Sequence, residues 1–405
     1  MGKPEIRFKG YTDEWEQRKL GDVLDDMYNG QTPSRNKSEY WNGNIKWLSS
    51  GELNRGTVYD SMEMITEDGQ KSANLRIVPK GTFIMAITGL EAAGTRGNCA
   101  LLGFDTTLNQ SCMALFPKKD LLTSDFLFQW YRKVGEEYGI NYTQGTKQQS
   151  YNAELIKILP ISLPSVAEQR KIASYLSNLD HLITLHQRKC DEVKSLKKYM
   201  LQKMFPQNEQ KVPEIRFEGF TEAWEQRKLG ELYQRNTERN ENLIGYDKTI
   251  SVATMSYKDD GNGASESSLS TYKVIRVGDI AFEGHTNKQF RFGRFVVNDI
   301  GTGIMSPRFS TLRPLNEMPV NFWKQYIHSE SVMRRILVNS TKAGTMMNEL
   351  VIPEFLNQTI MVPSENEQAV IGQYFTNLDH LITLHQQKCE ELKKIKKFML
   401  QKMFV

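Results

Sequence analysis

Residues 178–205 read NLDHLITLHQRKCDEVKSLKKYMLQKMF, and residues 377–404 read NLDHLITLHQQKCEELKKIKKFMLQKMF. The two stretches are related by a constant offset of 199, and 22 of their 28 positions are identical. Apolar residues recur in each stretch at alternating spacings of four and three, which is typical of a helix that packs against another helix. The sequence therefore predicts two long helices, and each helix is an obvious partner for the other.

The two predicted helices share their seams and their starts. The seam residues are Ile172, Leu176, Leu179, Ile183, His186 and Cys190 in the first helix, and Ile371, Phe375, Leu378, Ile382, His385 and Cys389 in the second. Ser165 and Ser364 each open an S-x-x-E sequence, which is typical of a capping box at a helix start. We expect helices of about 40 residues, roughly 60 Å long, paired as an intramolecular antiparallel coiled coil. A helix that only dimerises separate chains is the alternative.

The start of the chain is also repeated. Residues 4–21 (PEIRFKGYTDEWEQRKLG) return as residues 213–230 (PEIRFEGFTEAWEQRKLG), with 14 of 18 positions identical. The chain therefore consists of two tandem halves, each with a globular domain followed by a long helix. The predicted boundaries are 1–163 for the first domain, 164–206 for the first helix, 207–362 for the second domain and 363–405 for the C-terminal helix.

The globular domains keep a common frame while their sequences differ. Val78–Ile84 in the first domain corresponds to Val274–Ile280 in the second, and both predict a strand entered through a glycine turn. Further strands are predicted at 45–48, 82–87, 108–116 and 295–297, and helices at about 123–135 and 319–338. The fold class is mixed α/β (α+β): two similar globular domains separated by two antiparallel helices, pseudo-twofold and pseudo-circular.

Composition limits the function classes. The 405 residues carry a net charge of only +4 and four cysteines. No signal peptide and no apolar run of membrane-spanning length is found, so we expect a soluble cytoplasmic protein without a membrane anchor. Residues 161–211 carry nine basic and five acidic side chains and hold most of the excess. Any basic face on the domains must therefore be offset by an acidic face elsewhere, which could meet a partner.

No catalytic motif is found in the sequence. It has no P-loop, no G-x-G-x-x-G after a strand, no G-x-S-x-G and no H-E-x-x-H. His186 and Cys190 lie four residues apart, as do His385 and Cys389, so an antiparallel crossing could bring all four together as a zinc site. The favoured interpretation is that these residues only fill the seam, so no metal ligand is assigned.

Polar loops that combine glycine with Arg, Lys, Gln or Asn are the candidate DNA-contacting segments, because such side chains bind base edges and phosphates. Each loop taken alone is also explained as a solvated turn. The candidate residues are Thr32, Ser34, Arg35, Asn36, Lys37, Thr88, Arg96, Lys147 and Gln148 in the first domain, and Asn287, Lys288, Arg291, Arg294, Arg308 and Lys342 in the second.

Several of these features together resemble the DNA specificity subunits of Type I restriction-modification enzymes. The resemblance covers nearly the whole chain. It rests on the tandem arrangement, the G-x-T-P-S-R loop at 30–35 with Tyr40-Trp41 and Ile45-Lys46-Trp47, the Glu-Gln pairs within 164–169 and 363–368, and the near-identical helices.

The resemblance implies a non-catalytic subunit with two target recognition domains, each of which reads one half of a bipartite, asymmetric site in double-stranded DNA. It implies that the helices set the length of the non-specific spacer and dock two methyltransferase subunits, and that two restriction (motor-nuclease) subunits join the complex. S-adenosylmethionine, ATP and Mg²⁺ would then belong to the partners, and this chain would hold no cofactor.

Three other functions remain to be distinguished. A stand-alone DNA-binding regulator would bind its operator tightly without partners. A coiled-coil scaffold for proteins would show no salt-dependent DNA affinity. A self-contained methyltransferase would need a donor-binding motif, and none is found in the sequence.

Overall fold

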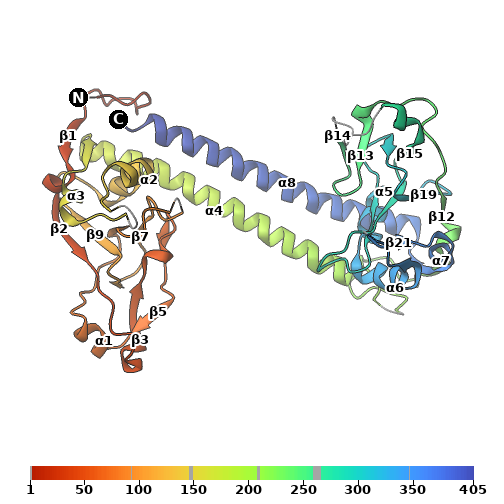
Figure 1. The fold of residues 1–405 in the computed structure, drawn as a ribbon, viewed down its shortest axis with the longest axis horizontal. Helices are drawn as coiled ribbons and strands as arrows, with labels where there is room; N and C mark the ends of the chain where they lie inside the picture. Colours follow the sequence, from red (N-terminus) through yellow and green to blue (C-terminus); the bar gives the residue numbers. More distant parts are fainter. Residues whose placement is uncertain (1, 93, 146–148, 208–209, 259–265, 346) are drawn as a thin grey trace. The chain divides into compact units, whose positions relative to one another are not determined.

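The computed structural model describes residues 2–405 except 93, 146–148, 208–209, 259–265 and 346. The chain forms two compact units, residues 1–186 with 388–405, and residues 187–387. Each unit therefore contains one globular domain and a part of both long helices (Figure 1). Among the described residues, no helix is both long enough and apolar enough to cross a membrane.

The first unit is built on a five-stranded sheet of order β2-β9-β6-β7-β4 and a smaller sheet of order β5-β3-β8. The small sheet and α1 lie together at one end of the unit (Figure 1). Its strands are β1 (Glu16–Lys19), β2 (Leu24–Asn29), β3 (Trp41–Leu48), β4 (Thr57–Val58), β5 (Glu63–Ile65), β6 (Phe83–Ala86), β7 (Cys99–Leu102), β8 (Thr107–Leu108), β9 (Cys112–Pro117) and β10 (Pro160–Leu163). Its helices are α1 (Glu67–Ser72), α2 (Ser124–Asn141), α3 (Ala153–Lys157) and the first part of α4 (Val166–Lys203).

The core of the first unit lies between the main sheet and α2. All four residues of β6 are buried, and α2 directs Phe126, Trp130 and Val134, spaced four apart, into the same core. This spacing places the three side chains on one face of the helix. Thr123 caps α2 by accepting a hydrogen bond from the backbone N–H of Phe126 at 3.2 Å.

The second unit repeats the frame of the main sheet in the order β12-β19-β16-β17 and adds a second sheet of order β14-β13-β18-β15. Its strands are β11 (Glu225–Lys228), β12 (Tyr233–Arg235), β13 (Thr249–Ser251), β14 (Ser256–Lys258), β15 (Lys273–Ile275), β16 (Ile280–Glu283), β17 (Arg294–Val297), β18 (Gly303–Met305), β19 (Ser310–Pro314), β20 (Thr341–Lys342), β21 (Glu349–Leu350) and β22 (Thr359–Val362). Its helices are α5 (Val320–Tyr326), α6 (Glu330–Ser340), α7 (Ile352–Asn357) and the first part of α8 (Glu365–Lys402).

Most predicted elements are present, with one difference in each unit. In the first unit the strand predicted over 108–116 is two strands, β8 in the small sheet and β9 in the main sheet. The helix predicted over 319–338 is divided into α5 and α6, and the break includes His328. The ring of His328 contacts the carbonyl oxygen of Phe295 on β17 at 3.0 Å, and burial lowers the pKa of this imidazole. Packing against the sheet therefore interrupts a helical pattern that looks continuous in sequence.

The long helices begin at Val166 and Glu365, as predicted, and run antiparallel within each unit. In the first unit the thiol of Cys389 lies 3.9 Å from the carbonyl oxygen of Ile183, and in the second Cys190 makes the same contact with Ile382. The seam residues Ile172, Leu176, Leu179 and Cys190, and their counterparts Ile371, Phe375, Leu378 and Cys389, are buried, whereas Ile183, His186, Ile382 and His385 are partly exposed.

The end of each long helix completes the core of a globular domain. Met204 and Phe205, at the end of α4, are buried in the second unit, and Met403 and Phe404, after α8, are buried in the first. The backbone N–H of Ile6 donates to the carbonyl of Lys402 at 2.9 Å, so the two ends of the chain meet in the first unit. This contact is the pseudo-circular closure predicted from the sequence.

Of the two hydrogen bonds predicted for each capping box, the serine bond is present and the glutamate bond is not. The hydroxyls of Ser165 and Ser364 accept the backbone N–H groups of Glu168 and Glu367 at 3.4 Å. The glutamate side chains do not reach back along the helix. Glu168 instead forms a bidentate pair with Arg7 at 2.7 and 2.8 Å, and Glu367 pairs with Arg216 at 2.7 Å.

A buried lysine supports the helix pairing in the first unit. Asp180 on α4 forms ion pairs with Lys396 on α8 and with Arg132 on α2, the latter at 2.6 Å. Burial, with a smaller contribution from Arg132, lowers the pKa of Lys396 to about 8. In the second unit the equivalent pair, Asp379 and Lys197, lies at 2.6 Å and its lysine is more exposed, 19% against 6%.

We predict that Asp180→Asn lowers the free energy of unfolding by about 1–3 kcal/mol near pH 7, because Lys396 then lacks its counter-charge. Asp180 itself is 35% exposed, so solvent screening keeps the loss moderate. Asp379→Asn is the matched control and should cost less. Urea unfolding of both variants measures the difference, and equal losses would contradict the prediction.

The loss in Asp180→Asn should also shrink as the pH rises from about 7 to about 9. The folded-state pKa of Lys396 is lowered to about 8, whereas a lysine in the unfolded chain titrates near 10.4. Above the folded-state pKa the unfolded chain binds more protons, so rising pH favours the folded state. Asp180 raises the pKa of Lys396, so its loss lowers this pKa further. In the variant, the free energy of unfolding therefore begins to rise with pH at a lower pH than in the unchanged chain. A loss that grows with pH would contradict this reasoning.

Candidate nucleic-acid interface

Two predicted loops of the first unit leave the main sheet at the same edge. The strand register pairs Asn29 with Met113, Ala86 with Cys112 and Met85 with Cys99. The end of β2, the end of β6, the start of β7 and the start of β9 therefore lie side by side. Loops 30–37 and 87–98 both emerge there, so the structure brings together segments that are about 50 residues apart in sequence.

The third predicted loop of the first unit joins the second. Thr88 forms an isolated antiparallel bridge with Ser150, and the backbone N–H of Leu90 donates to the carbonyl of Gln149 at 3.1 Å. The backbone N–H of Gln149 in turn donates to the carboxylate of Glu91 at 3.0 Å. These bonds hold the described part of loop 144–149 against loop 87–98.

The G-x-T-P-S-R loop is held by two tryptophans. The indole N–H of Trp47 donates to the carbonyl of Gln31 at 3.0 Å, and that of Trp41 donates to the carbonyl of Ser34 at 3.1 Å. Gly30 is required because a Cβ there would lie 2.0 Å from the carbonyl oxygen of Leu108. The loop therefore has a defined backbone before any ligand binds.

Arg35 lies at the tip of this loop in a fixed position. Its guanidinium carbon is 3.7 Å from the ring centroid of Trp41, and its second nitrogen donates to the carboxylate of Glu63 at 2.9 Å. The pair with Arg35 lowers the pKa of Glu63 and raises that of Arg35. Stacking and bidentate pairing pre-orient a planar cation, although Glu63 offsets its charge.

The predicted loops of the second unit also emerge from one edge of its main sheet. The register pairs Arg235 with Leu312, Phe282 with Ser310 and Glu283 with Arg294. The segment after β12, the loop between β16 and β17, and the segment before β19 therefore leave at the same edge. This edge corresponds to the loop-bearing edge of the first unit.

A cleft of about 410 Å³ is lined by two of these segments and by the segment around β20 and β21. His285 comes from the loop after β16, Arg308 from the segment before β19, and Thr345 and Glu349 from the segment around β20 and β21. Gly284 closes one side, where a Cβ would meet the carbonyl oxygen of Asn348 at 1.9 Å. The cleft is lined by polar and charged residues together with the apolar Phe282, Phe309 and Leu350, a composition that suits contact with base edges.

Several predicted basic residues already have partners within their own unit. Arg96 donates to the carbonyls of Leu90 and Glu91 at 3.0 and 3.1 Å, and so shapes its own loop. Arg294 pairs with Glu283 at 2.6 Å. Lys342 pairs with Glu349 at 3.2 Å, and Lys37 donates to the hydroxyl of Tyr40 at 3.0 Å.

A second group is available for ligands. Within the described part of the chain, the side chains of Lys288, Arg291 and Arg308 are exposed and have neither a hydrogen bond nor an ion pair. The polar candidates Ser34 and Asn36 are exposed, Thr88 is partly exposed, Thr32 hydrogen-bonds Gln110, and Asn287 accepts from the backbone of Gln289 and Phe290. Lys147 and Gln148 lie outside the described residues. Direct DNA contact by any of these residues remains a prediction.

Sequence reasoning missed the acidic side chains that balance the candidate cations. Glu63, Glu283 and Glu349 each pair with a predicted DNA-binding residue, at separations of 28, 11 and 7 positions along the chain. A hairpin register would have identified Glu283, because it lies opposite Arg294 on paired strands. Glu63 has no such signal, because its pairing depends on how a long loop folds over the small sheet.

The histidines and cysteines of the helices form no recognisable metal centre. Among the described residues, no group of three or more His, Cys, Asp or Glu side chains is arranged to hold a metal ion. Cys190 and Cys389 instead contact main-chain carbonyls in the seam. His186 and His385 also have interactions within the structure.

Comparison with known proteins gives consistent matches along both halves. A family model described as "Type I restriction modification DNA specificity domain" matches residues 12–195 and 221–394. The MjaIX specificity subunit of a Type I restriction enzyme from Methanocaldococcus jannaschii is 33% identical over 174 residues, covering 42% of this chain and 39% of that protein. The chain thus matches only about two-fifths of that relative's length. The MjaVIII specificity subunit from the same organism is 23% identical over 409 residues, covering 95% of this chain and 91% of that protein.

A solved structure shares the fold. The crystal structure of a Type-I restriction-modification system S subunit from M. genitalium aligns with a TM-score of 0.62 at 14% identity. The alignment covers 100% of this chain and 99% of that chain. At this identity the likeness concerns the fold, and it agrees with the predicted arrangement of two similar α/β domains with two long helices.

We predict that Arg308→Ala and Lys288→Ala each weaken DNA binding and reduce the magnitude of its salt slope by about 1, because each removes one cation available to phosphates or bases. Arg96→Ala should mainly lower thermal stability, because its guanidinium holds two loop carbonyls. Fluorescence anisotropy over a salt series, with thermal unfolding in parallel, separates the two effects. An Arg96→Ala variant with normal stability and the same DNA defect would contradict this division.

Proposed function

Because this chain belongs to the Type I restriction-modification DNA specificity family, we propose that it reads a bipartite site in double-stranded DNA. Each globular domain recognises one half of the site. The observation that carries this proposal is the repeated sheet frame, β2-β9-β6-β7 in one unit and β12-β19-β16-β17 in the other, with loops of different sequence at the same edge. A common frame with different loops suits recognition of two different half-sites.

The charge at the loop edges supports DNA as the ligand. Lys288, Arg291 and Arg308 are exposed cations in the second unit, Arg308 lines the polar cleft there, and Arg35 is a stacked guanidinium in the first unit. Arginine suits such a site because its planar group can bind guanine or phosphate with two hydrogen bonds. Glu63, Glu283 and Glu349 offset nearby cations, which should limit non-specific binding to phosphate.

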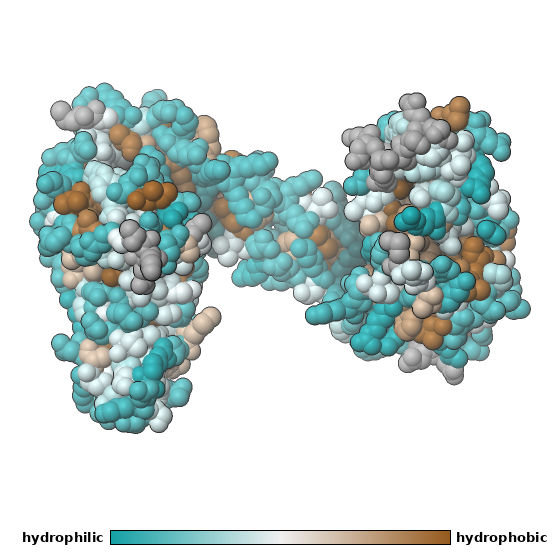
Figure 2. Space-filling model, in the orientation of Figure 1, coloured by the Kyte–Doolittle hydropathy of each residue, from teal (hydrophilic) through white to brown (hydrophobic). Residues whose placement is uncertain are grey.

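The helices carry matching exposed apolar side chains that suit a protein partner present in two copies. The first unit exposes Leu182, Ile395 and Phe398, and the second exposes their counterparts Leu381, Leu196 and Tyr199. Brown apolar surface is visible on the helical segments in Figure 2. Single exposed apolar side chains are ordinary, but their repetition at equivalent positions of the two units suits a partner that binds twice. We therefore assign them to two methyltransferase subunits, and two motor-nuclease subunits would join that core.

In this proposal the chain supplies specificity and its partners supply chemistry. S-adenosylmethionine, ATP and Mg²⁺ are bound by the methyltransferase and motor-nuclease subunits, and this chain acts without a cofactor of its own. The complex works on DNA in the cytoplasm. The helices set the distance between half-sites, and a separation of one DNA turn, about 34–36 Å, suits recognition from one side of the duplex.

We predict that replacement of residues 1–160 by the corresponding domain of another specificity subunit changes one half of the methylated sequence and leaves the other half intact. The reason is that each loop-bearing edge belongs to a single unit. Methylome sequencing of cells that carry the chimaera and its partners provides the measurement. A change in both halves, or in neither, would count against the proposal.

The length of the non-specific gap between the half-sites provides a second test. Insertion of four residues, about one helical turn, at matching positions of α4 and α8 should lengthen the non-specific gap and leave both half-sites unchanged. Methylome sequencing again gives the answer. If the gap stays constant in an active complex, the helices do not set it.

The isolated chain distinguishes this proposal from a stand-alone regulator and from a protein scaffold. We expect weak DNA binding by the chain alone and much tighter, sequence-specific binding once methyltransferase subunits are added. Tight operator binding without partners would favour a regulator. Absence of any salt-dependent DNA affinity, with or without partners, would favour a scaffold.

A further inference from the structure

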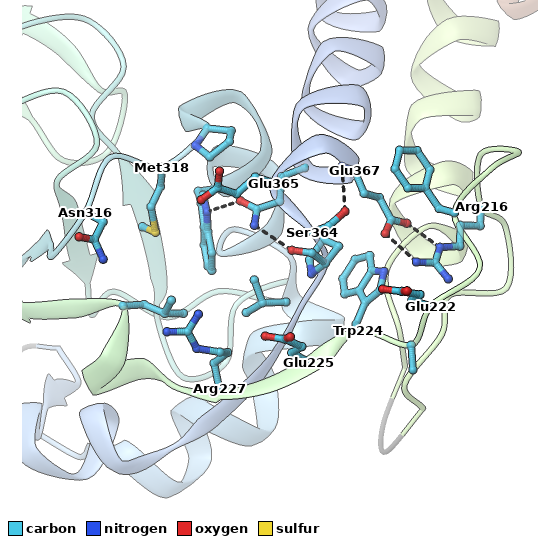
Figure 3. Close-up of a pocket in the computed structure, with 18 of the residues that line it drawn as sticks. Arg216, Glu222, Trp224, Glu225, Arg227, Asn316, Met318, Ser364, Glu365 and Glu367 are labelled. Atoms are coloured by element: carbon cyan, nitrogen blue, oxygen red, sulfur yellow. Dashed lines mark hydrogen bonds and ion pairs between the residues drawn. The ribbon is translucent and has the colours of Figure 1, made fainter.

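A second cleft, of about 420 Å³, lies in the second unit away from the loop-bearing edge. It is bounded by the repeated segment around 216–232, by residues 316–319 and by the first turn of α8 (Figure 3). Two acidic residues in its wall are neutralised, because Glu367 pairs with Arg216 at 2.7 Å and Glu231 pairs with Arg227 at 3.0 Å.

The other carboxylates of this cleft form no ion pair within the described part of the chain, although the pKa of the Arg216 guanidinium, raised mainly by its hydrogen bonds to Glu367, is raised further by the nearby Glu222. Glu222, Glu225, Glu317 and Glu365 line it and are exposed. Within the described part of the chain, none of their side chains has a hydrogen bond or an ion pair. Figure 3 shows Glu222, Glu225 and Glu365 on different sides of the cleft. Four unpaired carboxylates around one cleft repel phosphate and attract a cation.

A buried donor also lines the cleft. Trp224 is only 2% exposed, and its indole nitrogen has no hydrogen-bond partner. Figure 3 places this ring between Ser364 and Glu222. A buried N–H without an acceptor is unfavourable, and a carbonyl group brought into the cleft with a small side-chain shift would provide one.

We infer that this cleft binds a lysine- or arginine-bearing segment of a methyltransferase subunit, because the first turn of α8, one of the two helices assigned to that partner, forms part of its wall. The side-chain cation lies among Glu222, Glu225 and Glu365, and a main-chain carbonyl of the segment accepts from the indole N–H of Trp224. The inference rests on the proposed function, because that function supplies the partner subunits. It adds a polar contact separate from the apolar helix sites, and it provides the acidic face expected from the low net charge.

The second unit suits this role better than the first. Glu16, which corresponds to Glu225 in the repeated segment, pairs with Arg18 at 2.8 Å. Val166 occupies the position that corresponds to Glu365. Trp15, like Trp224, has an indole N–H without a partner, so the donor alone does not distinguish the units. The unpaired carboxylates do, and we therefore expect the basic segment to bind the second unit.

The main test neutralises the cleft in the full-length chain. The variant is Glu222→Gln with Glu225→Gln and Glu365→Gln, and the control is Asp13→Asn with Glu16→Gln in the first unit. Biolayer interferometry at low and high salt measures binding to the purified methyltransferase subunit and, separately, to the assembled complex with motor-nuclease subunits. We expect about a tenfold loss for the purified methyltransferase subunit and a weaker salt dependence, with DNA affinity of the isolated chain unchanged and little effect in the control.

A milder variant tests the donor without altering charge. Trp224→Phe keeps an aromatic ring in the core and removes only the indole N–H, so we expect a loss of partner affinity of about threefold with normal thermal unfolding. Trp15→Phe is the matched control and should bind as the unchanged chain does. Carbodiimide coupling of the complex should join Glu222, Glu225 or Glu365 to a lysine of the partner, and this product should be absent with the neutralised variant.

The outcomes separate the two proposals. If the neutralised variant binds every partner as tightly as the unchanged chain, the inference is wrong while the proposed function stands. If neutralisation raises DNA affinity and leaves partner binding unaltered, the cleft only repels DNA, and the inference is again wrong. If the unchanged chain binds neither subunit, the proposed function fails as well.

Discussion

A buried arginine–glutamate pair anchors each globular domain to its helix. Glu168 and Glu367 are each only 1% exposed, and each carboxylate is held at both oxygens by the arginine of an E-I-R-F sequence. A buried carboxylate that loses its partner destabilises a protein by about 3–5 kcal/mol. The repeated segment that opens each domain is therefore tied to the first turn of the helix that closes it.

This anchoring explains why the two halves can differ so much at their loop edges. The paired strands β1–β10 and β11–β22, the anchored glutamates and the buried helix ends all belong to the repeated segments or lie next to them. The loops at the far edge of each main sheet contribute little to this framework. They are free to change in length and charge, and a subunit that reads unrelated half-sites requires that freedom.

The sequence predicted the long helices, their starts, their antiparallel pairing and the duplication, because these depend on local periodicity and on direct repetition. It also identified loops that meet in space within the first unit, since G-x-T-P-S-R and the residues near 88 both follow strands of its main sheet, and it identified the loop near 285 that follows a strand of the second main sheet. It could not predict which of the candidate cations already have a partner within the chain. The roles of Arg35 and Arg96 depend on contacts with Glu63 and with loop carbonyls, and these are set by how irregular segments fold over one another. The same limit explains the capping glutamates, whose partner arginines are about 150 residues away.

The contact between Ile6 and Lys402 is repeated by a bond of equal length, 2.9 Å, between Ile215 and Lys203. Ion pairs between Glu5 and Lys402 and between Glu214 and Lys203 accompany the two bonds. In one of these places the chain is continuous, and in the other it has its two ends. The same contact therefore forms in each unit, once between segments that are close in the sequence and once between segments at opposite ends of it. A permuted gene that joins the present ends through a short linker, and starts instead at the second E-I-R-F segment, would encode the same set of native contacts in a different order.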